Sequence, residues 1–119
     1  MARILLAEDD DSMRTFLARA LARAGHSVTA VGDGLSAVPL VDAEPFDLLL
    51  ADIVMPGMDG IDLAKYATRD NPEIKVMLIT GFAAVAVQAQ NMMTAGTKVL
   101  SKPFHLRILV EEVDKLLAA

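Results

Sequence analysis

The chain has 119 residues, of which 54% are hydrophobic and 4% aromatic, with a net charge of −5 and no cysteine. This length fits one domain spanning residues 1–119 with a real buried core, and the negative charge argues against a nucleic-acid-binding protein, which usually carries a basic face. No apolar run approaches the roughly 20 residues of a membrane-spanning helix, and disulfides are excluded, so we expect a cytoplasmic protein.

Short apolar runs alternate with amphipathic segments along the whole chain. Compact apolar runs predict strands, and apolar residues at helical spacing predict helices. In chain order we expect a strand at Arg3–Ala7, a helix at Ser12–Ala24, a strand at Ser27–Val31, a helix at Leu35–Ala43, a strand at Asp47–Ala51, a helix at Gly60–Arg69, a strand at Lys75–Thr80, a helix at Phe82–Ala95, a strand at Lys98–Ser101 and a helix at Leu106–Leu117.

Local signals set the ends and faces of the helices. Asp11 or Ser12 is expected to cap the first helix, and Asp59 the third. Pro39 lies inside the second helix, where it removes a hydrogen bond and kinks the backbone. The last helix is expected to bury its apolar positions, which are Leu106, Leu109, Val110, Val113, Leu116 and Leu117.

Alternating strands and helices predict the α/β fold class, with right-handed crossovers between parallel strands. The run Asp47–Ala51 shows no polar alternation, as is typical of a strand whose two faces are both covered by helices. Ligands of such folds bind beyond the carboxyl ends of the strands. The residues that follow the strands are therefore the candidates for function.

Acids, a hydroxyl and an amine stand at these strand ends. Glu8 and Asp9 follow the first strand, Asp52 follows the third, Thr80 ends the fourth and Lys102 follows the fifth. Clustered carboxylates repel one another, and a hard cation such as Mg²⁺ relieves that repulsion. An aspartate nucleophile beside a cation and an amine is suited to phosphoryl transfer.

The motifs that carry these residues are "ILLAEDD", "DLLLADIVMPGMDG", "VMLITG" and "KPF", in this order. Together they resemble the receiver domain of two-component response regulators, the CheY-like family, over the whole chain. The resemblance implies a flavodoxin-like (βα)5 fold: a five-stranded parallel sheet in a doubly wound, three-layer sandwich. It also implies a phosphorylated signalling domain that catalyses only its own phosphotransfer and autodephosphorylation.

The resemblance assigns a role to each residue of the site. Asp52 would be the phosphoacceptor and a Mg²⁺ ligand. Asp9 would bind the metal directly, Glu8 mainly through water, and Val54 through its backbone carbonyl. Lys102 would bind the phosphoryl group.

The resemblance also implies how a signal would spread. Thr80 would be the switch hydroxyl, and the bond between Lys102 and Pro103 is usually cis in the family. Many receivers have an aromatic residue where this chain has Val99, which cannot act as an aromatic gate. We therefore expect Thr80 to move while Gly81 and Phe82 carry the change into the next helix.

The implied phosphodonor is a histidine kinase or a histidine phosphotransferase. The output would be a downstream protein that binds the face of the fourth helix, fifth strand and fifth helix, where "FAAVAVQAQNMM" and Ile108 are candidate contacts. The segments "VMLITGFAAVAVQAQ" and "LSKPFHL" resemble short cell-cycle receivers of the CpdR type, which implies a phosphorelay donor and the ClpXP machinery as output. We expect a stand-alone regulator, either monomer or weak dimer, that binds neither nucleic acid nor membrane.

Other interpretations stay open. The chain could be the amino-terminal receiver of a longer DNA-binding regulator, or a pseudo-receiver that is never phosphorylated. An aspartyl-nucleophile phosphatase would want a second acid two residues after Asp52, where this chain has Val54. His26 and His105 have no partner motif and are expected at the surface.

Overall fold

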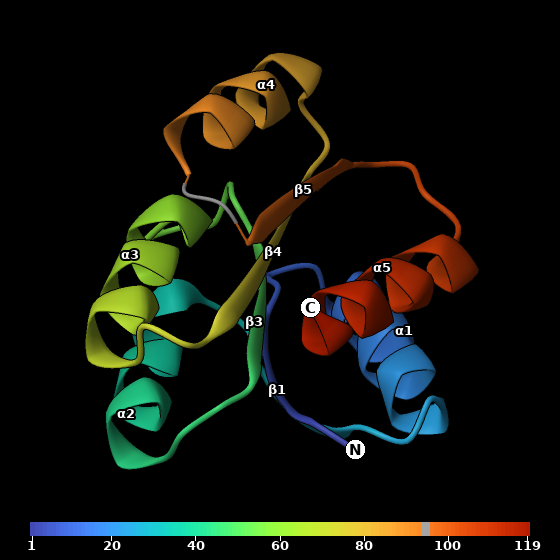
Figure 1. Cartoon of the computed structure of the whole chain (residues 1–119). Helices are drawn as coiled ribbons and strands as arrows, with labels where there is room; N and C mark the ends of the chain where they lie inside the picture. Colours follow the sequence, from blue (N-terminus) through green and yellow to red (C-terminus); the bar gives the residue numbers. More distant parts are fainter. Residues whose placement is uncertain (94–95) are drawn as a thin grey trace.

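The computed structural model describes residues 1–93 and 96–119, and within them five parallel strands form one sheet (Figure 1). The strand order across the sheet is β2-β1-β3-β4-β5, so the chain reverses direction across the sheet between β1 and β3. The strands are β1 (Arg3–Ala7), β2 (Ser27–Val31), β3 (Leu48–Asp52), β4 (Lys75–Thr80) and β5 (Thr97–Ser101).

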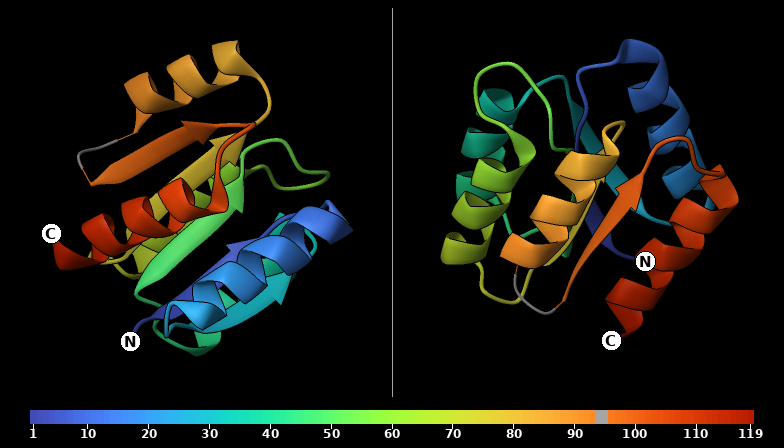
Figure 2. Two further views of the ribbon diagram at one scale, coloured as in Figure 1. Left: turned by 90° about the vertical axis from the view of Figure 1, so that its right-hand side faces the viewer. Right: turned by 90° about the horizontal axis from the view of Figure 1, so that it is seen from above.

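Five helices cover the sheet in the described residues, which gives the three layers of a doubly wound α/β sandwich. Figure 1 shows α2 and α3 on one face of the sheet and α1 and α5 on the other, and Figure 2 shows α4 beside β5 at the edge. The helices are α1 (Asp11–Arg23), α2 (Gly34–Ala43), α3 (Gly60–Asp70), α4 (Ala83–Met92) and α5 (Leu106–Ala118).

Alternate residues of the central strands feed two separate cores. Leu49 and Ala51 of β3 pack with α2, α3 and α4, whereas Leu48 and Leu50 pack with α1 and α5. Each of these four side chains is fully buried. The uninterrupted apolar run in β3 is therefore explained by helices on both faces, as the sequence predicted.

Most element boundaries agree with the prediction within one residue, and the helix with Pro39 inside it is continuous. The predicted cap of α1 is wrong, because Asp10 caps the helix by accepting from the Met13 amide at 2.9 Å. Asp59 caps α3 as predicted. The fourth helix was predicted to reach Ala95, which lies outside the described residues; α4 ends at Met92.

Two side chains differ from expectation. Leu106 is 37% exposed, because it is the first residue of α5 and the apolar face begins only at Leu109. His26 is not a free surface residue: its Nδ1 accepts from the Ala2 amide at 3.2 Å, and its Nε2 lies 2.9 Å from Asp114 Oδ1. No helix in the described part of the chain is both long and apolar enough to span a bilayer.

Candidate functional site

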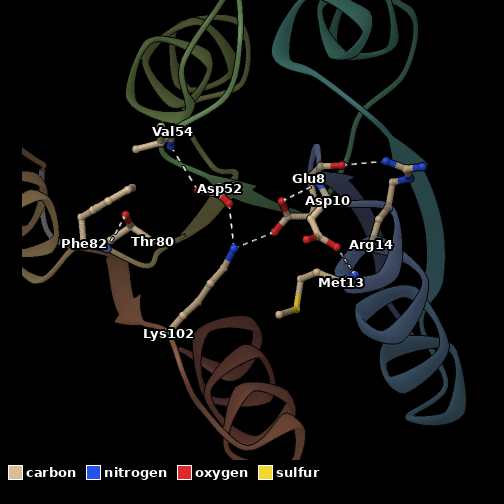
Figure 3. Close-up of polar contacts among 9 residues, drawn as sticks. All are labelled: Glu8, Asp10, Met13, Arg14, Asp52, Val54, Thr80, Phe82 and Lys102. Atoms are coloured by element: carbon tan, nitrogen blue, oxygen red, sulfur yellow. Dashed lines mark hydrogen bonds and ion pairs between the residues drawn. The ribbon is translucent and has the colours of Figure 1, made fainter.

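The carboxyl ends of the parallel strands bring the predicted polar residues to one edge of the sheet (Figure 3). Asp52 is the last residue of β3 and Thr80 the last of β4, while Glu8 follows β1 and Lys102 lies one residue beyond β5. Asp52 and Thr80 are almost fully buried, although strands usually end in solvent-exposed turns. The register of the sheet therefore sets the spacing of the site.

Lys102 joins two carboxylates that come from different strands. Its Nζ donates to Asp52 Oδ2 at 2.8 Å and to Glu8 Oε1 at 3.1 Å. The Glu8 side chain is completely buried, the Asp52 side chain is 9% exposed and that of Lys102 is 22% exposed. A single ammonium thus compensates two acids that would otherwise repel each other in a poorly solvated place.

The environment of Glu8 favours its protonated form. Burial raises the pKa of Glu8 to about 7, and the nearby charge of Asp52 acts in the same direction. The Asp10 amide, which donates to Glu8 Oε2 at 3.1 Å, and the Lys102 ammonium partly oppose this rise in pKa. The acid is therefore poised near neutral pH, where a cation in the site would favour its ionised form.

Lys102 stays charged in this environment. Burial alone would lower the pKa of Lys102, but the hydrogen bonds to Asp52 and Glu8, together with their charges, outweigh it and raise the pKa above its usual value. A permanently charged amine is what an incoming anion needs as a partner. The site thus holds one fixed positive charge beside several acids.

Glu8, Asp9 and Asp52 each offer a carboxylate oxygen, and these three atoms lie within 4.8 Å of one another. Glu8 and Asp52 are buried, whereas Asp9 is exposed at the mouth of the site. This set of oxygen donors, open to solvent on one side, fits a hard divalent cation such as Mg²⁺, which keeps several waters of its own. The role predicted for the Val54 carbonyl stays a prediction.

The loop after β3 holds Asp52 by its backbone. The Val54 amide donates to Asp52 Oδ1 at 3.1 Å, which fixes the carboxylate that Lys102 binds from the other side. Gly57 has a positive φ of 78°, a conformation that favours glycine. At Gly60 a Cβ would lie 2.3 Å from the Asp52 carbonyl oxygen, so no other residue fits without moving the strand end.

Thr80 is fully buried and its Oγ1 accepts from the Phe82 amide at 3.2 Å. This hydrogen bond connects the end of β4 to the residue that precedes α4. The Thr80 carbonyl in turn accepts from the Lys102 amide at 2.7 Å, and the bond between Lys102 and Pro103 is cis, as the resemblance implied. The hydroxyl and the lysine are therefore linked through two adjacent strand ends.

A sequence profile described as the response regulator receiver domain matches residues 4–114. The chain belongs to this family. The protein described as response regulator receiver protein CpdR of Brucella abortus is 57% identical over 119 residues, which cover all of this chain and 99% of that protein. The receiver domain is also 36% identical to the FleR protein of Pseudomonas aeruginosa, of which it spans only 24%, and 37% identical to TctD of Salmonella typhimurium, of which it spans 50%.

Solved structures agree with the fold of the receiver domain. A response regulator receiver protein from Sinorhizobium medicae superposes with a TM-score of 0.92 at 29% identity, covering 99% of this chain and 95% of the other. The receiver domain of the hybrid histidine kinase CckA gives a TM-score of 0.81 at 34% identity, covering 97% and 98%. The predicted CheY-like fold class is confirmed, and the chain is a receiver domain of two-component signalling.

The structure brings together all of the side chains that the sequence singled out, and it adds two that the sequence analysis missed. Asp10 caps α1 and its amide binds Glu8, while Arg14 Nη1 donates to the Glu8 carbonyl at 2.9 Å. Arg14 lies one turn into α1 and also pairs with Asp11 at 2.6 Å. An arginine three residues after an acid was the available signal, since such pairs face each other on a helix.

Proposed function

We propose that this receiver domain accepts a phosphoryl group on Asp52 from a phosphohistidine donor in a Mg²⁺-dependent reaction. The observation that carries the proposal is the position of the Asp52 carboxylate, 2.8 Å from Lys102 and grouped with the acids Glu8 and Asp9. Glu8, Asp9 and Asp52 would hold the metal, which supplies charge neutralisation for the transferred phosphoryl group. The donor would be a histidine kinase or a histidine phosphotransferase.

The side chains of the site suit this reaction. A carboxylate oxygen of Asp52 forms a bond to phosphorus while the phosphorus–nitrogen bond of the donor breaks, and the released imidazole takes a proton from solvent. The Val54 amide and Lys102 hold the carboxylate from two sides, so the nucleophile is oriented before the donor arrives. Lys102 can then bind the new phosphoryl oxygens, whose charge exceeds that of the carboxylate they replace.

Intact-mass measurement after incubation with a small phosphodonor and Mg²⁺ tests this proposal. The wild-type chain should gain one phosphoryl group, whereas Asp52→Ala should gain none and Lys102→Ala should gain it far more slowly. Asp62→Ala, which removes an exposed acid of α3, is the matched control and should behave like wild type. Modification of Asp52→Ala to the wild-type extent, or equal modification of wild type in excess chelator, would refute the proposal.

We propose further that phosphorylation acts through Thr80 and Phe82 on the face formed by α4, β5 and α5. Val99 is partly buried in the core beside α4, which leaves no aromatic ring at the position where many receivers have one. If the Thr80 hydroxyl turns toward the phosphoryl group, it gives up the hydrogen bond from the Phe82 amide. Phe82 is 59% exposed and Ile108 40% exposed, so both are accessible to a partner on this face.

Amide spectra with and without a phosphoryl mimic test this route. Wild type should show large changes in α4 when the mimic binds, and Phe82→Ala should show much smaller ones, because the lever between Thr80 and α4 is shortened. Ile108→Ala is the control, since it lies on the same face but beyond the hinge. A shift of α4 in Phe82→Ala as large as that of wild type contradicts the route.

A stand-alone, cytoplasmic regulator, monomer or weak dimer, that acts by protein contact is the form of output we propose. The support is the match to CpdR, of which this chain covers 99%, whereas it spans a quarter to a half of FleR and TctD. The likeness to CpdR is also the whole support for a phosphorelay donor and for ClpXP as the output. Phosphorylated and unphosphorylated chain passed over immobilised ClpX test this, and equal, absent binding of both forms counts against it.

A further inference from the structure

A groove between α3 and α4 lies away from the phosphorylation site and from the α4–β5–α5 face. It encloses a cavity of about 270 Å³. Figure 2 shows the two helices next to each other when the molecule is seen from above. The lining residues are Lys65, Thr68 and Arg69 from α3 and Met92 and Met93 from α4.

The size and lining of this groove suit a side chain of another protein. Pockets for small molecules and cofactors usually measure roughly 300–1,000 Å³ and enclose most of the ligand. This cavity lies below that range and is open along the helices, so it can take about one large apolar side chain. Two methionines at the base provide a flexible and polarisable contact, as is common on surfaces that adapt to protein partners.

The helix on one side of the groove is unusual for a surface helix. From Gly81 to Thr97 the sequence contains no charged residue, although 23% of the chain is charged. Ala89 is the one fully buried residue of α4, while Val87 is 63% and Met92 57% exposed. Solvated helices normally carry charges on their outer face, so an apolar, charge-free one points to a contact surface.

The helix on the other side supplies positive charge. Lys65 and Arg69 are four residues apart on α3 and therefore lie on the same face, one turn from each other. Neither forms an ion pair with a carboxylate within residues 1–93 and 96–119, although acids outnumber bases in the chain. The Arg69 guanidinium lies 5.8 Å from the centroid of the Tyr66 ring, which orients it without neutralising it.

We propose that this groove binds an amphipathic helical segment of a partner protein, which places an apolar side chain between the methionines and two carboxylates on Lys65 and Arg69. The two cations are one helical turn apart, so acids at positions i and i+4 of the partner helix match them. Guanidinium and ammonium groups bind carboxylates at this spacing without any rearrangement of α3. Two cations on a chain of net charge −5 are too few for nucleic acid or a lipid surface, which attract larger basic patches.

The test uses the full unphosphorylated chain and a synthetic helical peptide with one leucine flanked by glutamates four residues apart. A second peptide with glutamines in place of the glutamates is the matched probe. Methyl spectra of the methionines should show shifts at Met92 and Met93 on addition of the acidic peptide and much smaller shifts with the glutamine peptide. Shifts at other methionines alone, or no shift at all, would overturn the proposal.

Charge reversal locates the binding site independently. Lys65→Glu combined with Arg69→Glu should weaken the acidic peptide about tenfold or more, because two favourable ion pairs become repulsive. Arg107→Glu combined with Lys115→Glu changes the net charge by the same amount on α5 and should weaken it only slightly. An equal loss in both double variants would mean nonspecific attraction and overturn the groove as the site.

The proposed phosphorylation is kept separate in this design. Both double variants should melt like wild type, because all four side chains are exposed. They should also gain one phosphoryl group on Asp52, since neither pair lies in the site. Failure of peptide binding with normal phosphorylation would therefore count against the groove alone.

Discussion

Replacing Gly60 by alanine is the sharpest test of how the loop after β3 holds the site. Gly60 is the first residue of α3, and its Cα lies against the backbone of the strand end. A Cβ there would come within 2.3 Å of the Asp52 carbonyl oxygen and 2.9 Å of the Ile53 Cα. Cβ atoms essentially never approach other heavy atoms closer than 3.0 Å, so the backbone would have to move.

The strand end can hardly give way. The Ile53 amide donates to the Ile79 carbonyl at 2.8 Å, and the Gly60 amide donates to the Ile53 carbonyl at 2.9 Å. Displacing this segment therefore disturbs hydrogen bonds as well as packing. Overpacking of a well-packed site costs about 1–3 kcal/mol, and we expect Gly60→Ala to lose about 3 kcal/mol of unfolding free energy. For a domain of this size that lowers the melting temperature by about 12 °C.

Thermal and urea unfolding of Gly60→Ala and Gly81→Ala measures this difference. Gly81 is the matched control, because a Cβ there meets nothing within 4 Å and its φ is not positive. We expect Gly81→Ala to stay within about 1 kcal/mol of wild type or to be slightly more stable. Gly60→Ala should also accept the phosphoryl group poorly, since Asp52 moves with its carbonyl. Equal stability of the two variants would refute the reasoning about close approach.

Three further predictions follow from single contacts. Asp10→Ala should cost about 1 kcal/mol in urea unfolding because it removes the cap of α1, whereas Asp11→Ala should cost clearly less. In metal-free buffer wild type should lose stability as pH rises from 4.5 to about 7, because native Glu8 keeps a proton that the unfolded chain has released; Glu8→Gln should lack this slope, match wild type at low pH and be more stable by up to about 3 kcal/mol above pH 7. His26→Ala should cost about 1 kcal/mol by thermal unfolding, and adding Asp114→Ala should cost little more if the two side chains act as a pair.

The order and type of the elements could be predicted because each one has a complete local pattern. The strand Lys75–Thr80 has the predicted bounds, since apolar residues run unbroken up to a polar end. The cap of α1 could not be chosen from the sequence, because Asp9, Asp10 and Asp11 are all suitable acids. Only the path of the chain after β1 decides which of them faces the helix amides.

The grouping of the site was also predictable, whereas its pairing was not. Parallel strands place their carboxyl ends together, so the side chains of Asp52 and Lys102 had to be neighbours. That Lys102 binds both Asp52 and Glu8, and that Glu8 is completely buried, depends on how the side chains fill the space at that edge. The contact of His26 with Asp114 joins residues that are 88 positions apart, a distance over which no local pattern operates.

The unequal packing of the helices determines where a charge added at Asp52 should act. α1 and α5 each bury two large side chains against the sheet, whereas the fully buried residue of α4 is the small Ala89. Because free energy of burial scales with apolar area, displacing α4 costs less than displacing α1 or α5. One charge-assisted hydrogen bond contributes about 1.5–3 kcal/mol, which is enough to shift such a weakly held element. We therefore expect α4, joined to the site by the bond between Thr80 and Phe82, to respond before any other helix.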